Sequence, residues 1–407
     1  MSASQQKPRK PSVSPQRGLD VQYVRSDTEL DALVGVLLGV SRYGIDTEFL
    51  RERTYYARLA LLQVAWEDGI ALIDPTTVDV ARFAPVLSGK GLTILHAADQ
   101  DLEVLERTCG VVPDAIFDTQ LAAGFIGLST PSLQSIVERL LGLRLEKGDR
   151  LTDWSHRPLT PDQLRYAAGD VAHLLELHEI LRERLCELNR LDWANDEFAL
   201  LRARSRSVAP IEQAWWRLKH ARQLRGRERQ VAQAIAAWRE QRAMTLDVPT
   251  RFVLSDLALE SIAHRPPTSS TELCNVRGLD ARVLSDGVGA ALFDAISEGL
   301  SMDGSKLCLP AHAPTDVAAK PAVSLVAAWV NERAHELQID PSILATRADL
   351  ALYLKDPPEG RLANSWRHGL IGEPIRRLVG GDASLALEGG TRLVLEERSG
   401  RPLVQEP

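Results

Sequence analysis

The sequence predicts an α/β domain with a sheet of mixed direction, followed by two small all-α domains. Between about residues 20 and 120, runs with strand character alternate with helical runs. Two strand-like runs are joined by a short turn, which predicts an antiparallel pair within this alternation. From about residue 130 the strand-like runs stop and helical patterns dominate. These three observations separate an N-terminal α/β part from a helical remainder.

The strand-like runs are rich in aromatic and β-branched residues, and the helical runs have a longer period. The predicted strands are residues 43–50, 57–75 (two strands around the turn WEDG) and 92–96. The predicted helices are residues 31–40, 82–89 and 101–110, of which the third ends in a glycine, and a further helix that starts within residues 115–127. Asp118 is well placed as the N-cap of the last of these helices.

Residues 159–188 predict one long amphipathic helix with a clear start. Thr160 is its cap, Pro161 occupies the first helical position, and Gln163 completes a capping box. The segment 202–210 is the predicted linker to the helical remainder, and the proline-rich segment around residues 304–324 is a second boundary. Two alternating runs around Gly389 and Gly390 predict a hairpin near the C-terminus.

These boundaries divide the chain into six parts. They are a disordered tail (1–18), the α/β domain (19–205), a first helical domain (206–303), a linker (304–323), a second, degenerate helical domain (324–385) and a C-terminal hairpin and tail (386–407). In the second helical domain, the spacing of a tryptophan, an alanine and a proline echoes that of the first, which predicts an internal repeat. The echoing residues are Trp329, Ala334 and Pro341 against Trp238, Ala243 and Pro249.

The composition is that of an ordinary globular protein, with 407 residues, 44% hydrophobic and 25% charged. Four widely spaced cysteines fit neither a zinc site nor a disulfide framework, which indicates a reducing, cytoplasmic location. No apolar run approaches the roughly 20 residues that span a bilayer, and the polar, basic tail has no apolar core of a signal peptide. We therefore expect no membrane partner.

Carboxylates recur in three places. Asp46 and Glu48 are two apart in a strand, so their side chains project to the same side. Asp99 and Asp101 lie at the start of a helix that follows the strand ending at His96. The long helix supplies an aspartate among small and apolar neighbours, with a tyrosine four residues before it on the same face: Asp170 and Tyr166.

Acids that converge in one pocket repel one another and lose hydration, and hard divalent cations relieve both costs. Mg²⁺ or Mn²⁺ is favoured over zinc, because no Cys or second His joins the set. Two such ions clamp a phosphodiester, activating a water and stabilising the leaving oxygen. Carboxylates that converge would therefore suit a two-metal nuclease, whereas an isolated D-x-E strand is usually a solvated face.

In order along the chain, D-x-E, H-x-x-x-x-D and Y-x-x-x-D resemble the motifs of the DEDD exonuclease superfamily, in its tyrosine-bearing branch. More narrowly, "IDTEF", "HAADQDLEVL", "FDTQLAA" and "LTDWSHRPLTPDQLRYAAGDV" resemble bacterial ribonuclease D, and the resemblance extends from about residue 20 and weakens after 310. It implies a ribonuclease H-like α/β domain that acts as a 3′→5′ exoribonuclease with two metal ions per site. The implied substrate is RNA with a single-stranded 3′ end, in particular tRNA precursors, and the products are nucleoside 5′-monophosphates.

The resemblance also implies a role for each matching residue. Asp46 would bridge the two ions, Glu48 and Asp170 would hold the hydrolytic ion, and Asp101 would hold the second. Tyr166 would orient the attacking water. Asp101 is preferred to Asp99 because it is followed by Leu102, as in the family. His96 is left out of the metal set, as a histidine satisfied at a strand end.

Residues 210–295 resemble the HRDC domain of RecQ-type helicases and ribonuclease D, with one amphipathic helix over 236–243, a proline turn into a second helix and a loop into a third. Residues 202–242 hold eleven Lys or Arg against three acids, although the whole chain carries a net charge of −7. This run predicts phosphate contacts, and a solvated helix face explains it equally well. Of the paired Trp215 and Trp216, at least one is expected in the core. The candidate nucleic-acid contacts are Arg222, Arg225, Arg227 and Arg229, together with Lys147 and Arg157, which flank the third motif.

Two alternatives remain at this stage. The same carboxylates also cut DNA in repair-type exonucleases, although no polymerase or helicase motif accompanies them. The second alternative is a catalytically silent RNA-binding protein with this fold. The presence of all four acids argues against it. The phosphate-binding pattern G-x-x-x-x-G-K-[ST] is absent, so no nucleotide cofactor is expected.

Overall fold

The computed structural model describes residues 20–145, 152–206, 210–280, 284–285, 287–309, 320–355 and 358–399. The predicted tail 1–18 and Lys147 lie outside these ranges. The chain forms two compact units. One unit contains the chain up to Glu48, Ala60–Arg204 and the C-terminal part from Pro314, and the other contains Phe49–Leu59 and Ser205–Ala313.

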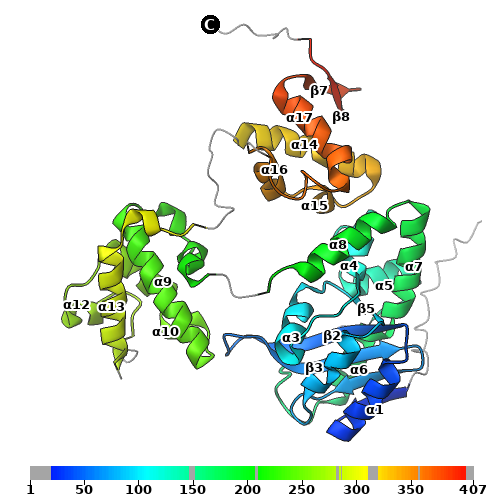
Figure 1. Cartoon of the computed structure of the whole chain (residues 1–407), viewed down its shortest axis with the longest axis horizontal. Coiled ribbons are helices and arrows are strands. Elements are labelled where there is room, and N and C mark those ends of the chain that lie inside the picture. The colour runs from blue at the N-terminus through cyan, green and yellow to red at the C-terminus, as the bar shows by residue number, and fades with distance from the viewer. Residues whose placement is uncertain are drawn as a thin grey trace, which may run out of the picture. The chain divides into compact units, whose positions relative to one another are not determined.

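A six-stranded sheet forms the centre of the first unit (Figure 1). Its strand order is β1-β4-β3-β2-β5-β6. Strands β3 and β4 pair antiparallel around the predicted turn, whereas β1–β4, β2–β5 and β5–β6 pair parallel, which confirms the mixed sheet. The strands are β1 (Asp20–Val24), β2 (Arg42–Leu50), β3 (Arg58–Trp66), β4 (Gly69–Ile73), β5 (Leu92–Leu95) and β6 (Ile116–Asp118).

Helices surround this sheet and carry apolar residues into its core. They are α1 (Asp27–Leu37), the 3-10 turn η1 (Val80–Phe83), α2 (Ala84–Leu87), α3 (Asp99–Cys109), α4 (Thr119–Gly124), α5 (Leu133–Leu141), α6 (Pro161–Ala172), α7 (Leu174–Glu187) and α8 (Leu191–Ala203). Asp118 caps α4, and Gly110 ends α3 with a left-handed φ of 75°. Both agree with the sequence prediction. Helix α8 takes in the first two residues of the predicted linker.

The predicted long helix over 159–188 is wrong in one respect, because it is two helices. Its start has the predicted capping box between Thr160 and Gln163, but the helix breaks at His173, where φ is −112° and ψ is 2°. Just after the break, Leu174 packs against β2 at Gly44, where an added Cβ would lie 3.0 Å from the Cβ of Leu174. The absence of a side chain at Gly44 therefore lets the junction of α6 and α7 lie directly on the strand that carries Asp46.

The C-terminal part of the first unit is a helical domain that ends in a hairpin. Strands β7 and β8 pair antiparallel around Gly389 and Gly390, as predicted. This domain packs on the α/β domain, where the backbone N–H of Asp340 donates to the carbonyl of Gly124 at 2.9 Å. Its elements are α14 (Lys320–Leu337), α15 (Pro341–Leu344), α16 (Arg347–Tyr353), the π-helical turn η6 (His368–Gly372), α17 (Glu373–Gly380), β7 (Ala383–Glu388) and β8 (Arg392–Glu397).

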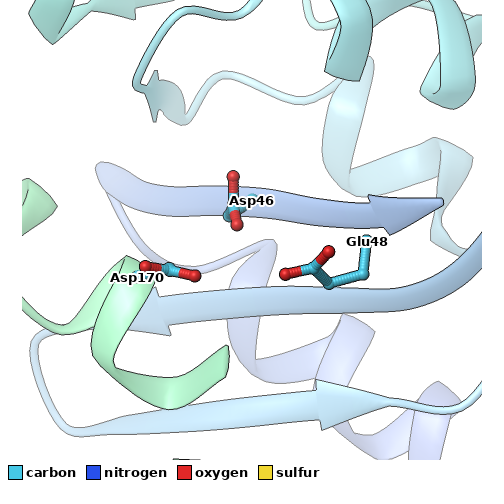
Figure 2. A group of neighbouring side chains, drawn as sticks. All are labelled: Asp46, Glu48 and Asp170. Carbon is cyan, nitrogen blue, oxygen red and sulfur yellow. The ribbon is translucent and has the colours of Figure 1, made fainter. Parts of the chain in front are cut away.

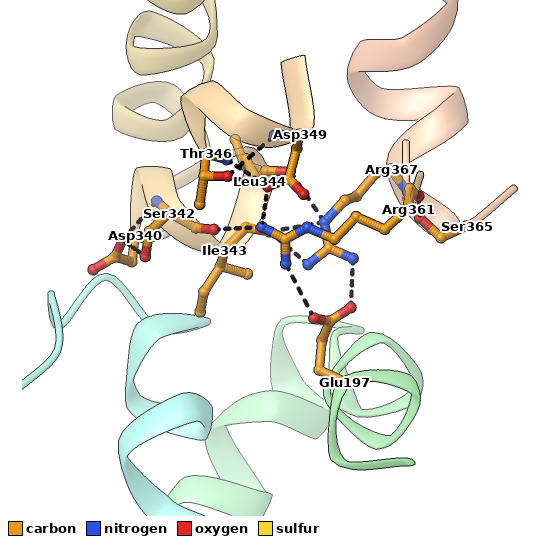
Figure 3. Close-up of polar contacts among 10 residues, drawn as sticks. All are labelled: Glu197, Asp340, Ser342, Ile343, Leu344, Thr346, Asp349, Arg361, Ser365 and Arg367. Atoms are coloured by element: carbon orange, nitrogen blue, oxygen red, sulfur yellow. Dashed lines mark hydrogen bonds and ion pairs between the residues drawn. The ribbon is translucent and has the colours of Figure 1, made fainter. Parts of the chain in front are cut away.

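A buried ion pair joins these two domains of the first unit (Figure 3). Arg367 is fully buried and pairs with Glu197 of α8, and it also donates to the carbonyls of Ile343 and Leu344. Beside this pair, the rings of Trp193 and Trp366 stack with centroids 4.8 Å apart.

The second unit is a helical domain around the buried Trp215. It also holds the segment Phe49–Leu59, whose Tyr55 hydroxyl donates to Glu240 and whose Tyr55 and Tyr56 backbone N–H groups donate to Asp247, both at 3.2 Å. The elements are η2 (Ile211–Arg217), η3 (Ala221–Gln223), α9 (Arg227–Leu246), α10 (Thr250–Val253), α11 (Asp256–His264), α12 (Ser270–Cys274), α13 (Val288–Ser301) and η5 (Gly304–Lys306).

Helix α9 contains the predicted segment 236–243, but it is not the amphipathic helix that was expected. It is buried around most of its circumference, and two of its charged residues, Arg239 and Glu240, are buried as well. These charges are paired with Asp256 and Arg217, both at 2.6 Å, which makes their burial tolerable.

The two helical domains share one order of backbone conformations. Helices α9 and α14 are each followed by a left-handed residue, Asp247 or Gln338, with φ of 49° in both cases. A four-residue helix comes next, α10 or α15, and then a residue with extended backbone, Leu254 or Ala345. A Ser or Thr N-cap then starts α11 or α16.

Candidate active site

Three carboxylates from two elements meet above strand β2 (Figure 2). Asp46 and Glu48 project to the same side of β2, because side chains of a strand alternate with period two. Asp170 reaches them from α6, and one oxygen of each of the three carboxylates lies within 4.8 Å of the others. The structure thus brings two of the three sequence motifs together.

The two aspartates of the second motif differ in burial and in partners. Asp99 and Asp101 both lie in the first turn of α3, but Asp99 is exposed and pairs with Arg204 at 2.8 Å. Asp101 is only 7% exposed and accepts a hydrogen bond of 2.5 Å from the Thr47 hydroxyl. It lies outside the compact group of three carboxylates, yet its charge is the strongest of the neighbouring charges that raise the pKa of Asp46.

All four carboxyl groups have raised pKa values. Loss of hydration is the first cause in each case, and the like charges of Asp101, Asp170 and Glu48 add to it at Asp46. The pKa of Glu48 is raised to about 8, that of Asp170 to about 7 and that of Asp101 to about 6, while that of Asp46 is raised well above its ordinary value. Asp46 feels the charges of all three others, so it lies at the electrostatic centre of the group.

These residues fit a divalent cation of the hard type. The three clustered donors are all carboxylate oxygens, which Mg²⁺ and Mn²⁺ prefer. A cation among them would stabilise the ionised carboxylates against burial and against one another's charge. The acidic cluster therefore indicates the use of divalent metal.

Tyr166 lies on α6 one turn before Asp170, and the two side chains are hydrogen-bonded. Burial raises the pKa of Tyr166 above its ordinary value, and the charge of Asp170 raises it further. The phenol is therefore protonated at neutral pH and acts as a hydrogen-bond donor. Its ring lies 6.2 Å from that of Trp154, so the residue is partly packed and partly directed at the acids.

His96 lies near the second motif but makes structural contacts. Its Nδ1 is 2.9 Å from the Thr119 hydroxyl, and its Nε2 is 3.0 Å from the carbonyl oxygen of Pro131. Burial lowers the pKa of His96, so the ring is neutral at ordinary pH. Both ring nitrogens of His96 therefore have partners within the protein.

Arg157, a candidate phosphate contact, is engaged inside the protein. Its guanidinium forms a two-pronged ion pair with Asp74, with distances of 2.6 and 2.8 Å. It also donates to the carbonyl oxygens of Trp154 and Ala60, both at 2.7 Å. These contacts describe a structural residue that ties the segment before α6 to the sheet.

The arginines of the basic run in the second unit differ in whether they are engaged within their own domain. Arg225, Arg227 and Arg229 each donate to backbone carbonyls of their own domain. Arg222 is exposed and lies over the Trp216 ring, 5.9 Å from its centroid. Trp215 is fully buried, whereas Trp216 is only partly so, as expected for this pair.

Two residues of the site were not singled out as functional from the sequence. Thr47 lies between the two strand acids and holds Asp101, and the only signal was a hydroxyl within the "IDTEF" motif. Asp118 was predicted only as a cap of α4, yet it also accepts hydrogen bonds from the two residues before α3. These hydrogen bonds connect residues about twenty positions apart in the chain, so no local sequence pattern predicts them.

Comparisons with known proteins agree with this geometry. The 3'-5' exonuclease family matches residues 21–186, and the HRDC domain family matches residues 228–296. Ribonuclease D of Bartonella henselae is 32% identical over 377 residues, covering 91% of this chain and 93% of that protein. Ribonuclease D of Nitrobacter hamburgensis is 33% identical over 381 residues, covering 92% and 99%.

The crystal structure of Escherichia coli RNase D, an exoribonuclease involved in structured RNA processing, superposes with a TM-score of 0.80. It is 29% identical and covers 89% of this chain and 99% of that one. Within the described ranges, no helix is long and apolar enough to cross a membrane. With a clustered set of acids on the expected sheet, and relatives matched over about nine-tenths of its length, the chain belongs to the ribonuclease D family of 3′→5′ exoribonucleases.

Proposed function

We propose that this enzyme shortens RNA from a single-stranded 3′ end with two divalent cations, Mg²⁺ or Mn²⁺, and releases nucleoside 5′-monophosphates. The observation that carries the proposal is the meeting of Asp46, Glu48 and Asp170 within 4.8 Å. When bound, such cations activate water and neutralise the charge that develops on the departing 3′ oxygen.

Each side chain of the candidate site has a separate role in this proposal. Asp46, whose pKa is raised by the charges of all three other acids, would contact both ions. Glu48 and Asp170 would hold the ion that activates the attacking water, and Asp101 would hold the other. The protonated Tyr166 donates its one O–H to Asp170, so it would orient that water by accepting a hydrogen bond at its oxygen, without acting as a base.

The natural substrate that we propose is a tRNA precursor with a 3′ extension, in the cytoplasm. The E. coli relative acts in structured RNA processing, and an HRDC domain is a module associated with nucleic-acid binding. Exposed Arg222, stacked on Trp216, is the best-placed of the candidate phosphate contacts in that domain. The four-conformation order shared by α9–α11 and α14–α16 supports a second, degenerate HRDC-like domain at 324–385.

The test is nuclease activity on a 3′-extended tRNA precursor that is labelled uniformly along the RNA, with and without Mg²⁺, following the nucleotides released. D46A and D170N should lose activity by several orders of magnitude, and D99N is the matched control because Asp99 is exposed and paired elsewhere. DNA of the same sequence serves as the second substrate. Activity of D46A and D170N near that of the unaltered enzyme would refute the assignment, and faster cleavage of DNA would refute the RNA preference.

A further inference from the structure

Asp118 accepts hydrogen bonds both from the helix that it caps and from a segment about twenty residues earlier. It ends β6 and is 3% exposed, and its Oδ1 accepts from the backbone N–H groups of Gln120 at 2.8 Å and Leu121 at 3.0 Å. This is ordinary N-capping of α4. The same carboxylate also accepts from the N–H groups of Ala97 at 3.2 Å and Ala98 at 2.8 Å.

Ala97 and Ala98 are the two residues at which the chain turns from β5 into α3. Ala97 has a φ of 60°, a left-handed conformation that is costly for alanine and persists only where the surroundings hold it. Ala98 is the N-cap of α3 and has no side chain that can accept a hydrogen bond. The start of α3 is therefore fixed from outside, by a carboxylate on the neighbouring strand.

Helix α3 carries Asp101 in its first turn. The carboxylate of Asp101 is nearly buried and meets the Thr47 hydroxyl at 2.5 Å, so a small shift of the helix start would move it away from Asp46. Partners of metal-holding carboxylates commonly govern metal affinity without touching the metal.

We propose that Asp118 is a positioning residue for the candidate metal centre: by binding the N–H groups of Ala97 and Ala98 it fixes the start of α3 and thereby places Asp101. This inference rests on the proposed function, because it takes Asp101 to hold a metal ion. Asp118 itself does not contact the reacting groups.

Two substitutions separate this role from capping of α4. A serine at this position still caps α4, since its Oγ can accept from the N–H groups of Gln120 and Leu121, but it is too short to bridge to Ala97 and Ala98. D118A removes both sets of contacts. If Asp118 places Asp101, D118S and D118A bind Mn²⁺ with equally reduced affinity, about 10- to 100-fold below the unaltered chain. If Asp118 matters only as a cap, D118S binds Mn²⁺ like the unaltered chain, and the proposal is overturned.

The measurement is isothermal titration calorimetry of the full chain with Mn²⁺, at a temperature where each variant is folded by circular dichroism. D118N is the milder variant for the case in which D118S or D118A fails to fold. It keeps the three contacts of Oδ1 and replaces the acceptor of Ala98 by a donor, so its loss of affinity should be smaller but measurable. S26A is the matched control, because it removes the side-chain cap of α1 and should leave Mn²⁺ affinity unchanged.

The D101N variant distinguishes an error in this inference from an error in the proposed function. Reduced Mn²⁺ affinity in D101N, with no further loss in D101N/D118S, supports action through Asp101. If the losses multiply instead, Asp118 does not act through Asp101 and the inference is wrong, while the metal assignment stands. If D101N binds Mn²⁺ as tightly as the unaltered chain, the assignment of Asp101 within the proposed function is what fails.

Discussion

The hydroxyl of Thr47 donates a hydrogen bond of 2.5 Å to Asp101, and both side chains are buried. Thr47 lies on β2 between the two strand acids, whereas Asp101 lies on α3. The bond therefore ties the second motif to the first, and it lowers the pKa of Asp101 against the effect of burial.

Replacing Thr47 by valine should weaken metal binding. T47V keeps the shape of the side chain but removes the donor, so the pKa of Asp101 rises above about 6 and more of this carboxyl is protonated at pH 7. We expect Mn²⁺ affinity by calorimetry to fall roughly 10-fold or more, and to recover as the pH is raised from 6 to 8. T47S retains the hydroxyl and should bind Mn²⁺ almost normally. Equal affinities for T47V and T47S would show that the bond has no role in the site.

In the metal-free enzyme, the free energy of unfolding should fall as the pH rises, because Glu48 is buried. The pKa of Glu48 is about 8 in the folded chain and about 4.3 for an ordinary glutamate. The unfolded chain therefore loses this proton first, and stability that is present at low pH is lost as the pH rises from about 4 to about 8. E48Q removes the effect, so in EDTA its melting temperature should exceed that of the unaltered chain by more at pH 8 than at pH 5.5.

With added Mn²⁺, the melting temperature of the unaltered chain should instead exceed that of E48Q. Binding to the folded state alone raises the melting temperature of the unaltered chain, and E48Q should gain less because it lacks one ligand. Differential scanning fluorimetry at the two pH values, with EDTA or Mn²⁺, gives all four comparisons. A pH-independent difference between E48Q and the unaltered chain in EDTA would contradict the raised pKa of Glu48.

The ion pair between Arg367 and Glu197 should be a major determinant of stability in the first unit. R367A leaves the carboxylate of Glu197 buried with a weaker partner, which costs about 3–5 kcal/mol in the free energy of unfolding. Urea unfolding followed by the fluorescence of the stacked Trp193 and Trp366 measures it. The control is R376A, which breaks the exposed pair with Glu373 and should cost no more than about 1 kcal/mol. Similar losses in the two variants would contradict the burial of Arg367.

Arg157 should be required for folding stability more than for RNA binding. Its two-pronged pair with Asp74 holds the pKa of that carboxyl well below its usual range. R157K cannot form both prongs, so its melting temperature should fall by several degrees while its affinity for single-stranded RNA stays within about twofold. R222A is the opposite case, with weaker and less salt-dependent RNA binding at unchanged stability. Loss of RNA affinity in folded R157K would restore Arg157 as a substrate contact.

Much of the fold follows from local sequence patterns. The period of two places Asp46 and Glu48 on one side of β2, and Thr160 with Gln163 marks the start of α6. Such features depend on backbone geometry within a few residues, so a single sequence reports them. The mixed direction of the sheet follows likewise from the short turn between β3 and β4.

The features that escaped prediction depend on residues far apart in the chain. Histidine is not a helix-breaking residue, yet α6 ends at His173. The next residue, Leu174, packs against β2 at Gly44. The second role of Asp118 joins it to Ala97 and Ala98, and the segment that follows Glu48 contacts a helical domain almost two hundred residues later. The motifs thus predict the acids of the candidate site, but not the long-range hydrogen bonds that Thr47 and Asp118 make.

The central claim is that carboxylates from β2, α3 and α6 hold divalent cations. Anomalous diffraction from a crystal of the full chain soaked in Mn²⁺ tests it most directly. We expect strong anomalous peaks bounded by Asp46, Glu48 and Asp170, with a second ion between Asp46 and Asp101, and loss of these peaks in D46A. A soaked crystal with no anomalous peak at these carboxylates, or with ordered Mn²⁺ only elsewhere, would show that they do not form the metal site.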